Sequence, residues 1–366
     1  MKPVLAALLV CFQVTACISL HELLQDKEQV TFYPTYGYLE DGYWIIPMRI
    51  YVHEHRPNTE GIVTRVARSI SGLSQAEIRV FRFRIRDFVA DSESLESVRF
   101  EFVNDPESSE YRLHDQSGNP VRTGLNGFKE GQLRISVKKA EKLLEQQGST
   151  DGWLTLQAVS ESHTGSGRVR LIEPVGLSVI SDIDDTVKVT EIPAGSGVVI
   201  RNTFFEEYKA VSGMAEMYQE WRDLPFHYVS GAPWQLYRPL ALFLYSGETQ
   251  FPEGSFHMKP VRKNLFSINT WRDLRQLVSN EHLTYNQKIS RIRTIKEHFP
   301  GRTFILVGDS GERDPEVYRK IQEMFPGQVK EIIIRDVTND RENNSERLEG
   351  MTVIPAPAIA GSLIRR

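Results

Sequence analysis

Residues 177–190, LSVISDIDDTVKVT, are the most informative stretch of the sequence. The first five residues are typical of a short buried strand, and the three aspartates Asp182, Asp184 and Asp185 follow almost at once. Aspartates that follow a strand are commonly turn formers or helix caps, but they also supply catalytic groups at the carboxyl edge of a parallel sheet. The surrounding sequence has to decide between these two interpretations.

The sequence that follows alternates between strand and helix patterns. Strands are predicted over 177–181, 226–230, 303–310 and 331–337, and helices over 202–221, 233–245, 288–299 and 314–325. Repeated alternation of this kind predicts an α/β fold with a parallel sheet covered on both faces. Residues 187–201 are expected to form a β-hairpin flap, and the tail over 351–366 is expected to be irregular.

Upstream, between about Val30 and Ile172, hydrophobic residues recur with a period of two. Clear alternation over 81–86, 98–102 and 133–137, separated by turn-rich stretches, predicts an antiparallel sheet of β-sandwich type. A row of arginines at Arg82, Arg84 and Arg86 is expected to form a cross-strand ladder with residues such as Glu101. One helix is predicted over 62–73.

The N-terminus reads as an export signal. An apolar run from Pro3 to about Ala16 is too short to span a bilayer and has the length of a signal-peptide core. Small residues lead into Cys17, and this end of the run resembles the lipobox of bacterial lipoproteins, in which that cysteine is lipidated. The resulting prediction is a lipoprotein of the bacterial cell envelope that faces the periplasm or the cell surface. An ordinary secretory signal or an N-terminal core helix remains an open alternative.

Composition narrows the class of protein. The chain has 366 residues and a net charge of -4, which suits two soluble domains and argues against nucleic acid as a partner. The predicted organisation is a signal peptide over 1–16, a β-rich domain over 17–172, a catalytic α/β domain over 173–350 and a tail over 351–366.

Reactive side chains stand after the predicted strands in a fixed chain order. Asp182 and Asp184 come first, then Ser230, then Lys288 at a helix start, then Asp309 and Asp314. Each alone has an ordinary structural explanation, and Asp314 also has the position of a helix cap. Because the carboxyl ends of parallel strands meet at one crevice, the set as a whole favours an active site.

This order resembles the four motifs of the haloacid dehalogenase superfamily, with "DIDDT" as the first motif and "GDSGERD", beginning at Gly308, as the fourth. More closely, "SDIDDTVK", "HYVSGAPWQLY" and "ILVGDSGERDPEVY" are similar to the catalytic domain of the fungal actin-patch-associated phosphatidate phosphatases, which share an active-site motif with lipins. The resemblance is dense from about Val175 to Val337. It implies a Rossmann-like catalytic domain that hydrolyses phosphomonoesters.

The resemblance also implies a role for each motif residue. Asp182 would be the nucleophile and Asp184 the general acid and base, with Mg²⁺ held by Asp182, the Asp184 carbonyl and Asp309. The remaining roles fall to residues that steady the loop, bind phosphoryl oxygens, neutralise charge or support the metal ligands: Thr186, Ser230, Lys288, Asp314 and Gly308. Asp185 has no role in this scheme.

The substrate is implied only by the resemblance and by the expected lipid anchor at a membrane surface. Phosphatidate is the first choice, with a basic segment at Lys259, Arg262 and Lys263 and the nearby Trp234 as possible contacts for it. A solvated loop is the plainer interpretation of the basic segment, and core packing is the plainer one for Trp234. Relatives commonly have "SNSPW" where this chain has "SGAPW", which puts substrate preference in doubt. The alternatives are an exported phosphatase for a soluble phosphomonoester and a surface adaptor without catalysis.

Overall fold

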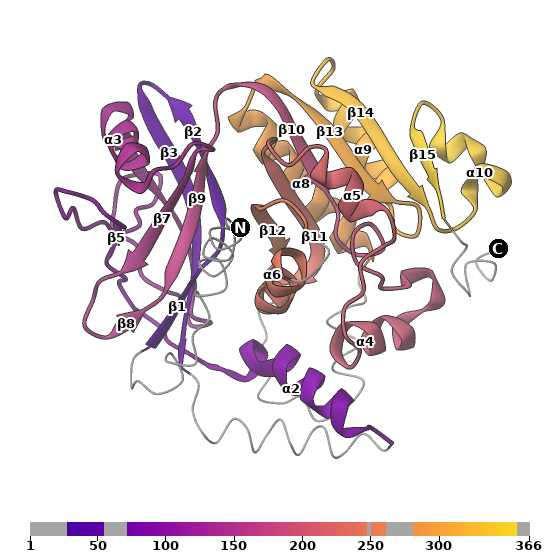
Figure 1. Cartoon of the computed structure of the whole chain (residues 1–366), viewed down its shortest axis with the longest axis horizontal. Coiled ribbons are helices and arrows are strands. Elements are labelled where there is room, and N and C mark those ends of the chain that lie inside the picture. The colour runs from indigo at the N-terminus through magenta and orange to yellow at the C-terminus, as the bar shows by residue number, and fades with distance from the viewer. Residues whose placement is uncertain (1–27, 55–71, 247–249, 261–280, 357–366) are drawn as a thin grey trace, which may run out of the picture.

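The structure is a computed structural model that describes residues 28–54, 72–246, 250–260 and 281–356. The expected signal peptide with Cys17, most of the helix predicted over 62–73, and the basic residues Arg262 and Lys263 lie outside these ranges. Within them the chain forms two sheets, one of nine strands and one of six, which Figure 1 shows side by side.

The nine-stranded sheet is built from the N-terminal half. Most of its pairs are antiparallel, as predicted, but β1 also pairs with β8, and β2 with β9, in parallel. In its longest strand pair, Tyr43–Tyr51 is antiparallel to Phe128–Ser136. Leu133 and Ile135 are buried while the residues between and after them are exposed, and this alternation is what a strand with one face on the core requires. The strands are β1 Glu28–Phe32, β2 Thr35–Glu40, β3 Tyr43–Glu54, β4 Asp91–Ser92, β5 Phe100–Phe102, β6 Phe128–Ser136, β7 Trp153–Ala158, β8 His163–Thr164 and β9 Ser166–Leu171.

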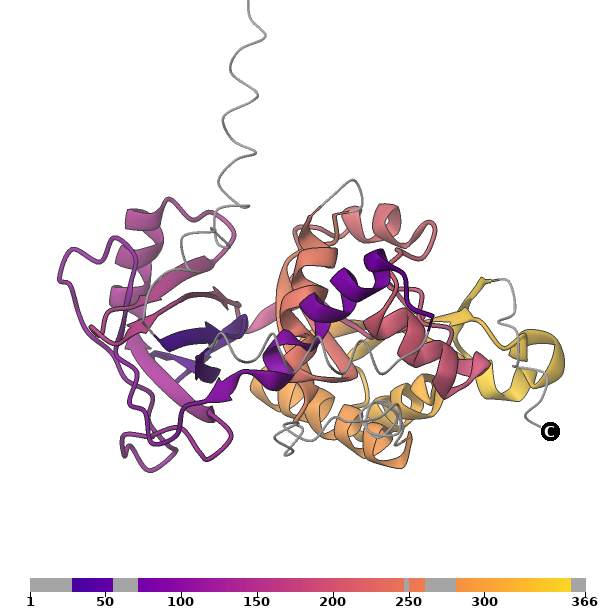
Figure 2. The same ribbon diagram turned by 90° about the horizontal axis from the view of Figure 1, so that it is seen from below.

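Two helices accompany this sheet. Helix α3 (Val137–Gln147) begins at Ser136, whose hydroxyl accepts a hydrogen bond from the Lys139 N–H, and it ends at Gly148 in the left-handed conformation. Helix α2 (Gln75–Val89) begins at Ser74 with a capping box to Glu77. Figures 1 and 2 place α2 below the sheets, against the helices of the C-terminal half.

The strand predicted over 81–86 was therefore wrong, since these residues lie inside α2. Phe81, Ile85 and Phe88 fall on one face of the helix and join the core of the C-terminal half. The alternation of arginines with apolar residues hid this period of three and four. The arginine ladder was also wrong, because Arg84 is buried against the Tyr208 ring, and Glu101 instead accepts a hydrogen bond from Gln157.

The six-stranded sheet runs in the order β12-β11-β10-β13-β14-β15, and each pair of neighbours is parallel. This confirms the predicted mixed α/β class with a parallel sheet. The strands are β10 Val175–Ser181, β11 Phe226–Pro233, β12 Gly254–Lys259, β13 Gly301–Asp309, β14 Val329–Asp336 and β15 Thr352–Pro355. The expectation of an irregular tail was wrong at its start, where β15 extends the sheet.

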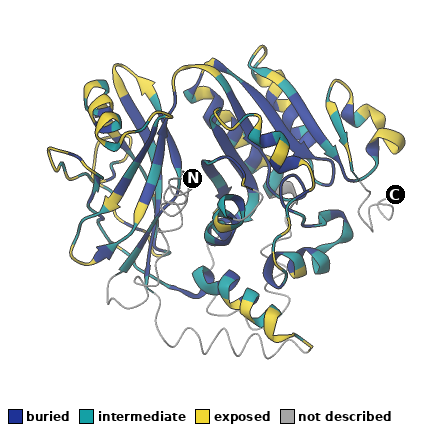
Figure 3. Cartoon of the chain, viewed as in Figure 1, coloured by how far each residue is buried: buried dark blue, intermediate teal, exposed yellow. Residues whose placement is uncertain are grey.

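Helices cover both faces of this sheet. Val179 points into a core shared with α4 (Ser196–Phe204), α5 (Met214–Gln219) and α6 (Tyr237–Tyr245), and the next residue, Ile180, points into a core shared with α8 (Glu281–His298) and α9 (Asp314–Met324). Figure 3 shows the strands of the sheet as mostly buried and the outer sides of the helices as exposed. Burial on both faces explains why β10 reads as a continuous apolar run.

The segment over 187–201 differs from the predicted hairpin. It contains the short 3₁₀ helix η3 (Ile192–Ala194) and the first part of α4. The predicted helix over 202–221 is likewise divided, since α4 ends at Phe204 and α5 begins at Met214. Smaller elements complete the half, namely η4 (Trp234–Leu236), α10 (Asp340–Asn343) and η5 (Ser345–Leu348).

Candidate active site

Strand order brings the predicted site residues to one edge of the parallel sheet. Asp182 follows β10, Ser230 lies in β11 and Asp309 ends β13, and β10 is the neighbour of both other strands. All three side chains are buried. The three predicted site residues therefore lie at the carboxyl ends of neighbouring parallel strands.

Lys288 is a cation at this edge. Its predicted position at a helix start was wrong, because α8 begins at Glu281 and Lys288 lies inside it. Its ammonium Nζ lies 2.7 Å from Asp182 Oδ1, 2.6 Å from Asp314 Oδ1 and 2.8 Å from Glu312 Oε2. Asp182, Asp314 and Lys288 are all at most 2% exposed. Burial alone would lower the pKa of Lys288, but the surrounding carboxylates outweigh it and raise that pKa well above its usual value. Lys288 is therefore a fixed cation among the acids.

The carboxylate of Asp182 is poorly satisfied despite this ion pair. Neither of its buried oxygens has a hydrogen-bond partner in the described part of the chain. Burial, assisted by the negative charges of Asp314, Glu312 and Asp184, raises the pKa of Asp182 well above its usual value even though Lys288 opposes this. A buried carboxyl group left in this state is costly unless something else binds it.

Asp309 has the same character. Its Oδ2 accepts hydrogen bonds from the N–H groups of Gly311 and Glu312, at 3.0 and 3.3 Å, whereas its buried Oδ1 has no partner among the described residues. Burial is the main cause of a pKa raised well above the usual value, and nearby carboxylates add to it. Asp182 Oδ2 and Asp309 Oδ1 are thus two buried carboxylate oxygens that have no partner among the described residues.

These two residues fit a divalent cation. Asp182, Asp309 and Asp314 each have a carboxylate oxygen within 4.8 Å of the others, the kind of oxygen cluster that Mg²⁺ prefers. Asp314 already binds Lys288 through one oxygen and the Asp309 N–H through the other, at 3.3 Å. Asp182 and Asp309 therefore remain the better candidates for metal ligands.

The carboxylate of Asp184 lies apart from Lys288 and has partners of its own. Its Oδ1 is 2.8 Å from Lys188 Nζ and accepts a hydrogen bond from the Thr190 hydroxyl at 2.7 Å, while its Oδ2 accepts one from Ser230 at 3.3 Å. Burial would raise the pKa of Asp184, but Lys188 and Thr190 outweigh burial and lower it. Asp182, which is buried, and Asp184, which is partly exposed, thus have pKa values shifted in opposite directions.

Asp185, which had no role in the sequence scheme, organises the loop. It has a left-handed backbone, with φ of 55°. Its carboxylate accepts hydrogen bonds from the N–H groups of Thr190, Glu191 and Ile192, at 2.6 to 2.8 Å. Because Thr190 in turn holds Asp184, Asp185 positions the acid–base residue through the backbone.

The supporting residues are also placed. Gly308 packs so closely on α9 that a Cβ there would lie 2.4 Å from Asp314 Oδ2. Asp314 is the first helical residue of α9 and not its cap, which is Arg313, so the cap interpretation was wrong. Thr186 is fully buried, and its hydroxyl has no hydrogen-bond partner within the described ranges.

Two charged residues of the site were not identified from the sequence. Glu312 stands inside the "GDSGERD" motif, between two aspartates that were identified, and Lys188 is four residues beyond Asp184. The short distance in sequence from each of them to a predicted site aspartate was a signal that could have identified them. Each residue has an ordinary reading as a solvated surface charge, and only the folded loops bring them inward.

The expected substrate contacts fare unequally. Lys259 ends β12, where burial lowers its pKa and the charge of Glu312 opposes this, so it lies near the site and not in a fully solvated loop. Trp234 is buried, with its ring centroid 4.4 Å from that of Tyr33 and the Arg49 guanidinium 4.8 Å above it. For Trp234, core packing is the confirmed interpretation.

Comparison with known proteins agrees with the motifs. Residues 177–336 match the family described as "Phosphatidate phosphatase APP1, catalytic domain". The chain is 33% identical over 173 residues to Phosphatidate phosphatase APP1 of Saccharomyces cerevisiae, and 28% identical over 178 residues to an uncharacterized protein of Schizosaccharomyces pombe. These alignments cover 46% and 47% of this chain but only 27% of each relative.

The predicted resemblance to this phosphatase family is thus confirmed for the α/β part of the chain. Among solved structures, one chain from work entitled "The active site of a carbohydrate esterase displays divergent catalytic and non-catalytic binding functions" overlaps with a TM-score of 0.21 at 10% identity, covering 83% of this chain and 87% of that one. A score this low carries no argument. No helix in the described residues is long and apolar enough to cross a bilayer.

Proposed function

We propose that this chain is a Mg²⁺-dependent phosphatase of the haloacid dehalogenase type that hydrolyses a phosphomonoester, with phosphatidate as the substrate. The observation that carries the proposal is the buried Asp182 carboxylate, whose Oδ1 contacts Lys288 at 2.7 Å and whose Oδ2 has no hydrogen-bond partner in the described structure. A purely structural aspartate would be satisfied by hydrogen bonds in such a position. A nucleophile has to keep an oxygen free.

The proposed reaction has two displacements. An Asp182 oxygen attacks phosphorus, the bond from phosphorus to the ester oxygen breaks, and an aspartyl-phosphate forms. Asp184, whose pKa is lowered by Lys188 and Thr190, takes a proton from solvent as the anionic substrate binds beside it, and donates that proton to the departing alkoxide. Asp184 then takes a proton from water as the water oxygen attacks phosphorus, and the bond to Asp182 breaks to release inorganic phosphate.

The other residues of the site stabilise charge. Lys288 is already oriented among carboxylates and neutralises negative charge next to the attacking oxygen. The Ser230 hydroxyl, now on Asp184 Oδ2, is placed to donate to a phosphoryl oxygen. Asp182 and Asp309, with the Asp184 carbonyl, would hold Mg²⁺, which when bound supplies charge relief between the anionic nucleophile and the phosphate.

The surroundings of the site favour a bulky substrate. Between β10 and β11 the chain forms only short elements, of which the longest is the nine-residue α4, so no cap domain is inserted there. The yeast relative is named a phosphatidate phosphatase, and this name supports the lipid as substrate here. We further propose a lipid anchor at Cys17 and a location at the bacterial cell envelope, which would hold the site near its substrate.

The test is phosphate release by the purified full chain from phosphatidate in mixed micelles and from a panel of soluble phosphomonoesters. We expect release from phosphatidate with Mg²⁺ and none after EDTA treatment. Asp184→Asn should reduce release at least ~10²-fold, the usual worth of one positioned acid–base group. Asp223→Asn, at a highly exposed aspartate, is the matched control and should retain full activity.

The outcomes separate the alternatives. Release from a soluble ester but not from phosphatidate would keep the chemistry and overturn the lipid assignment. No release from any ester, with native folding shown by circular dichroism, would overturn the phosphatase and leave the adaptor interpretation. Undiminished release in EDTA would overturn the metal requirement alone.

A further inference from the structure

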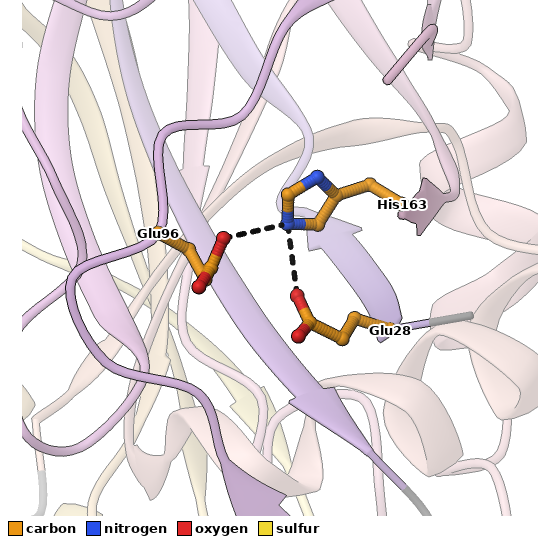
Figure 4. Close-up of side chains that lie close together, drawn as sticks. All are labelled: Glu28, Glu96 and His163. Carbon is orange, nitrogen blue, oxygen red and sulfur yellow. Dashed lines mark ion pairs between the residues drawn. The ribbon is translucent and has the colours of Figure 1, made fainter. Parts of the chain in front are cut away.

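A second cluster of metal-ligating side chains lies in the nine-stranded sheet, in the half of the chain away from the phosphatase motifs. Glu28 begins β1, His163 begins β8, and Glu96 lies in the loop after β4. Glu28 and His163 are directly paired in the parallel ladder between β1 and β8. Figure 4 shows the imidazole of His163 pointing between the two carboxylates.

The distances within this cluster suit a shared cation. His163 Nε2 lies 3.0 Å from Glu28 Oε2 and 3.4 Å from Glu96 Oε2, and all three ligand atoms lie within 4.8 Å of one another. Ligands about 2.0–2.2 Å from a tetrahedral zinc ion are roughly 3.3 Å from each other. The two distances from His163 Nε2 are thus close to those between ligands of one ion, and the glutamate oxygens lie at most 4.8 Å apart.

The histidine supplies independent support. It is only 4% exposed, and neither its Nε2 nor the buried Glu28 Oε2 has a hydrogen-bond partner among the described residues, although the two atoms are close. On the other side of the ring, Nδ1 is 2.6 Å from the Ser160 hydroxyl and 3.2 Å from that of Ser162. Metal-binding histidines usually donate their second N–H to an oxygen acceptor, and a serine hydroxyl that accepts from Nδ1 would fix the tautomer that leaves Nε2 free.

Charge around the cluster agrees. Burial, followed by the negative charges of Glu96, Glu93 and Glu54, raises the pKa of Glu28 to about 7. Burial lowers the pKa of His163, with Glu96 opposing it, so the ring is a poor counter-ion for the acids. Within the described residues neither Glu28 nor Glu96 has an ion pair with a lysine or arginine. Among the described residues the cluster therefore has acidic groups but no lysine or arginine paired with them.

We propose that Glu28, Glu96 and His163 bind a divalent transition-metal ion, with Zn²⁺ as the best fit. A nitrogen ligand beside two carboxylates favours such an ion over Mg²⁺ or Ca²⁺, which prefer oxygen alone. The ion joins the first described strand to β8 and to the loop that carries Glu96. The ion is a structural one that stabilises the nine-stranded sheet, and it is separate from the proposed catalytic edge.

The metal-free full chain is dialysed against dilute ZnCl₂ and then against buffer without zinc. The number of zinc ions retained per chain is measured by inductively coupled plasma mass spectrometry. His163→Gln, Glu28→Gln and Glu96→Gln should each bind one equivalent fewer than the wild type. Glu161→Gln is the control, because Glu161 is exposed in the same segment and outside the cluster. All measurements are repeated with Asp182→Asn and Asp309→Asn present, which removes zinc bound at the catalytic edge.

A second readout is thermal unfolding. In the Asp182→Asn/Asp309→Asn background, ZnCl₂ should raise Tm by about 3 °C or more, and His163→Gln should abolish this rise while circular dichroism stays native. Equal zinc content in the wild type and in all three cluster variants would overturn the proposal. So would the absence of any zinc uptake, which would leave only a histidine–glutamate ion pair.

Discussion

At the scale of single residues, Lys288 is the counter-charge for three acidic side chains at the carboxyl edge of the parallel sheet. Its ammonium touches Asp182, Glu312 and Asp314 at once. Lys288→Met would leave those carboxylates without a counter-charge, so we expect a loss of about 3–5 kcal/mol in the free energy of unfolding and no measurable phosphatase activity. Urea unfolding and phosphate release measure the two effects.

The matched control for this prediction is Lys320→Met. Lys320 pairs with Glu323 on the exposed surface of α9, so the free energy of unfolding should change by less than about 1 kcal/mol. If the two lysine variants were equally stable, Lys288 would not be the counter-charge described here.

Asp185 permits a prediction that separates positioning from chemistry. Asp185→Asn keeps the size of the side chain but replaces one of the two oxygens that accept the three loop N–H groups. We expect a loss of about 1–3 kcal/mol in stability and a fall in kcat at nearly unchanged KM, because Asp184 is then held less firmly. A variant with wild-type kcat would show that Asp185 does not act through Asp184.

At the scale of secondary-structure elements, α2 is a link between the two halves of the chain. Phe81 is fully buried and stacks on Phe205 with ring centroids 4.9 Å apart. Phe81→Ala should cost about 3–5 kcal/mol in the free energy of unfolding and expose α2 to limited proteolysis. Arg79→Ala, on the exposed side of α2, should do neither, and equal protease sensitivity of both variants would contradict the docking of α2.

Helix α8 carries a second buried lysine with a measurable pH signature. Lys296 donates a hydrogen bond to the Gln328 carbonyl at 3.1 Å and lies over the Phe304 ring, and burial lowers its pKa from 10.5 to about 7. Between pH 7 and 10.5 the unfolded chain therefore binds more protons at this position, so this group makes stability rise with pH. Below pH 7 its full penalty is present.

The measurement is urea unfolding of the wild type and Lys296→Met at several values between pH 6.5 and 9. The wild type should gain stability relative to the variant by at most about 1.4 kcal/mol per pH unit. Lys320→Met is again the control, and its stability should follow the wild type throughout. A constant difference between the wild type and Lys296→Met would show that Lys296 stays protonated in the fold.

These elements also show how far the sequence could predict the structure. Asp182, Ser230 and Asp309 were found because they lie at the carboxyl ends of strands that local patterns reveal. Lys288 was found although the start of its helix was predicted seven residues too late. Helix α2 was missed because its arginines alternate with apolar residues, and Arg84 is buried only through Tyr208, which lies far along the chain. Asp185 and Lys188 were missed because their partners depend on how the loop closes, and spacing alone does not show this.

At the scale of the whole molecule, the two sheets have separate tasks. The parallel sheet brings the proposed catalytic groups together at one edge. The nine-stranded sheet holds the proposed zinc site, and Tyr33, between β1 and β2, packs against Trp234. Gly231, where relatives commonly have Asn, lies so close to Thr284 of α8 that a Cβ would approach its methyl group to 2.8 Å. The helix therefore excludes a larger side chain beside Ser230.

The central claim, catalysis through Asp182, is tested most directly by following the phosphate itself. The full chain with Mg²⁺ is mixed with phosphatidate labelled in its phosphate, quenched in acid within one turnover, and digested so that labelled peptides are identified. We predict transient label on the peptide that contains Asp182, and in Asp182→Asn no label and at least ~10³-fold slower phosphate release. Phosphate release without label on Asp182, or near-normal turnover by Asp182→Asn, would contradict the account.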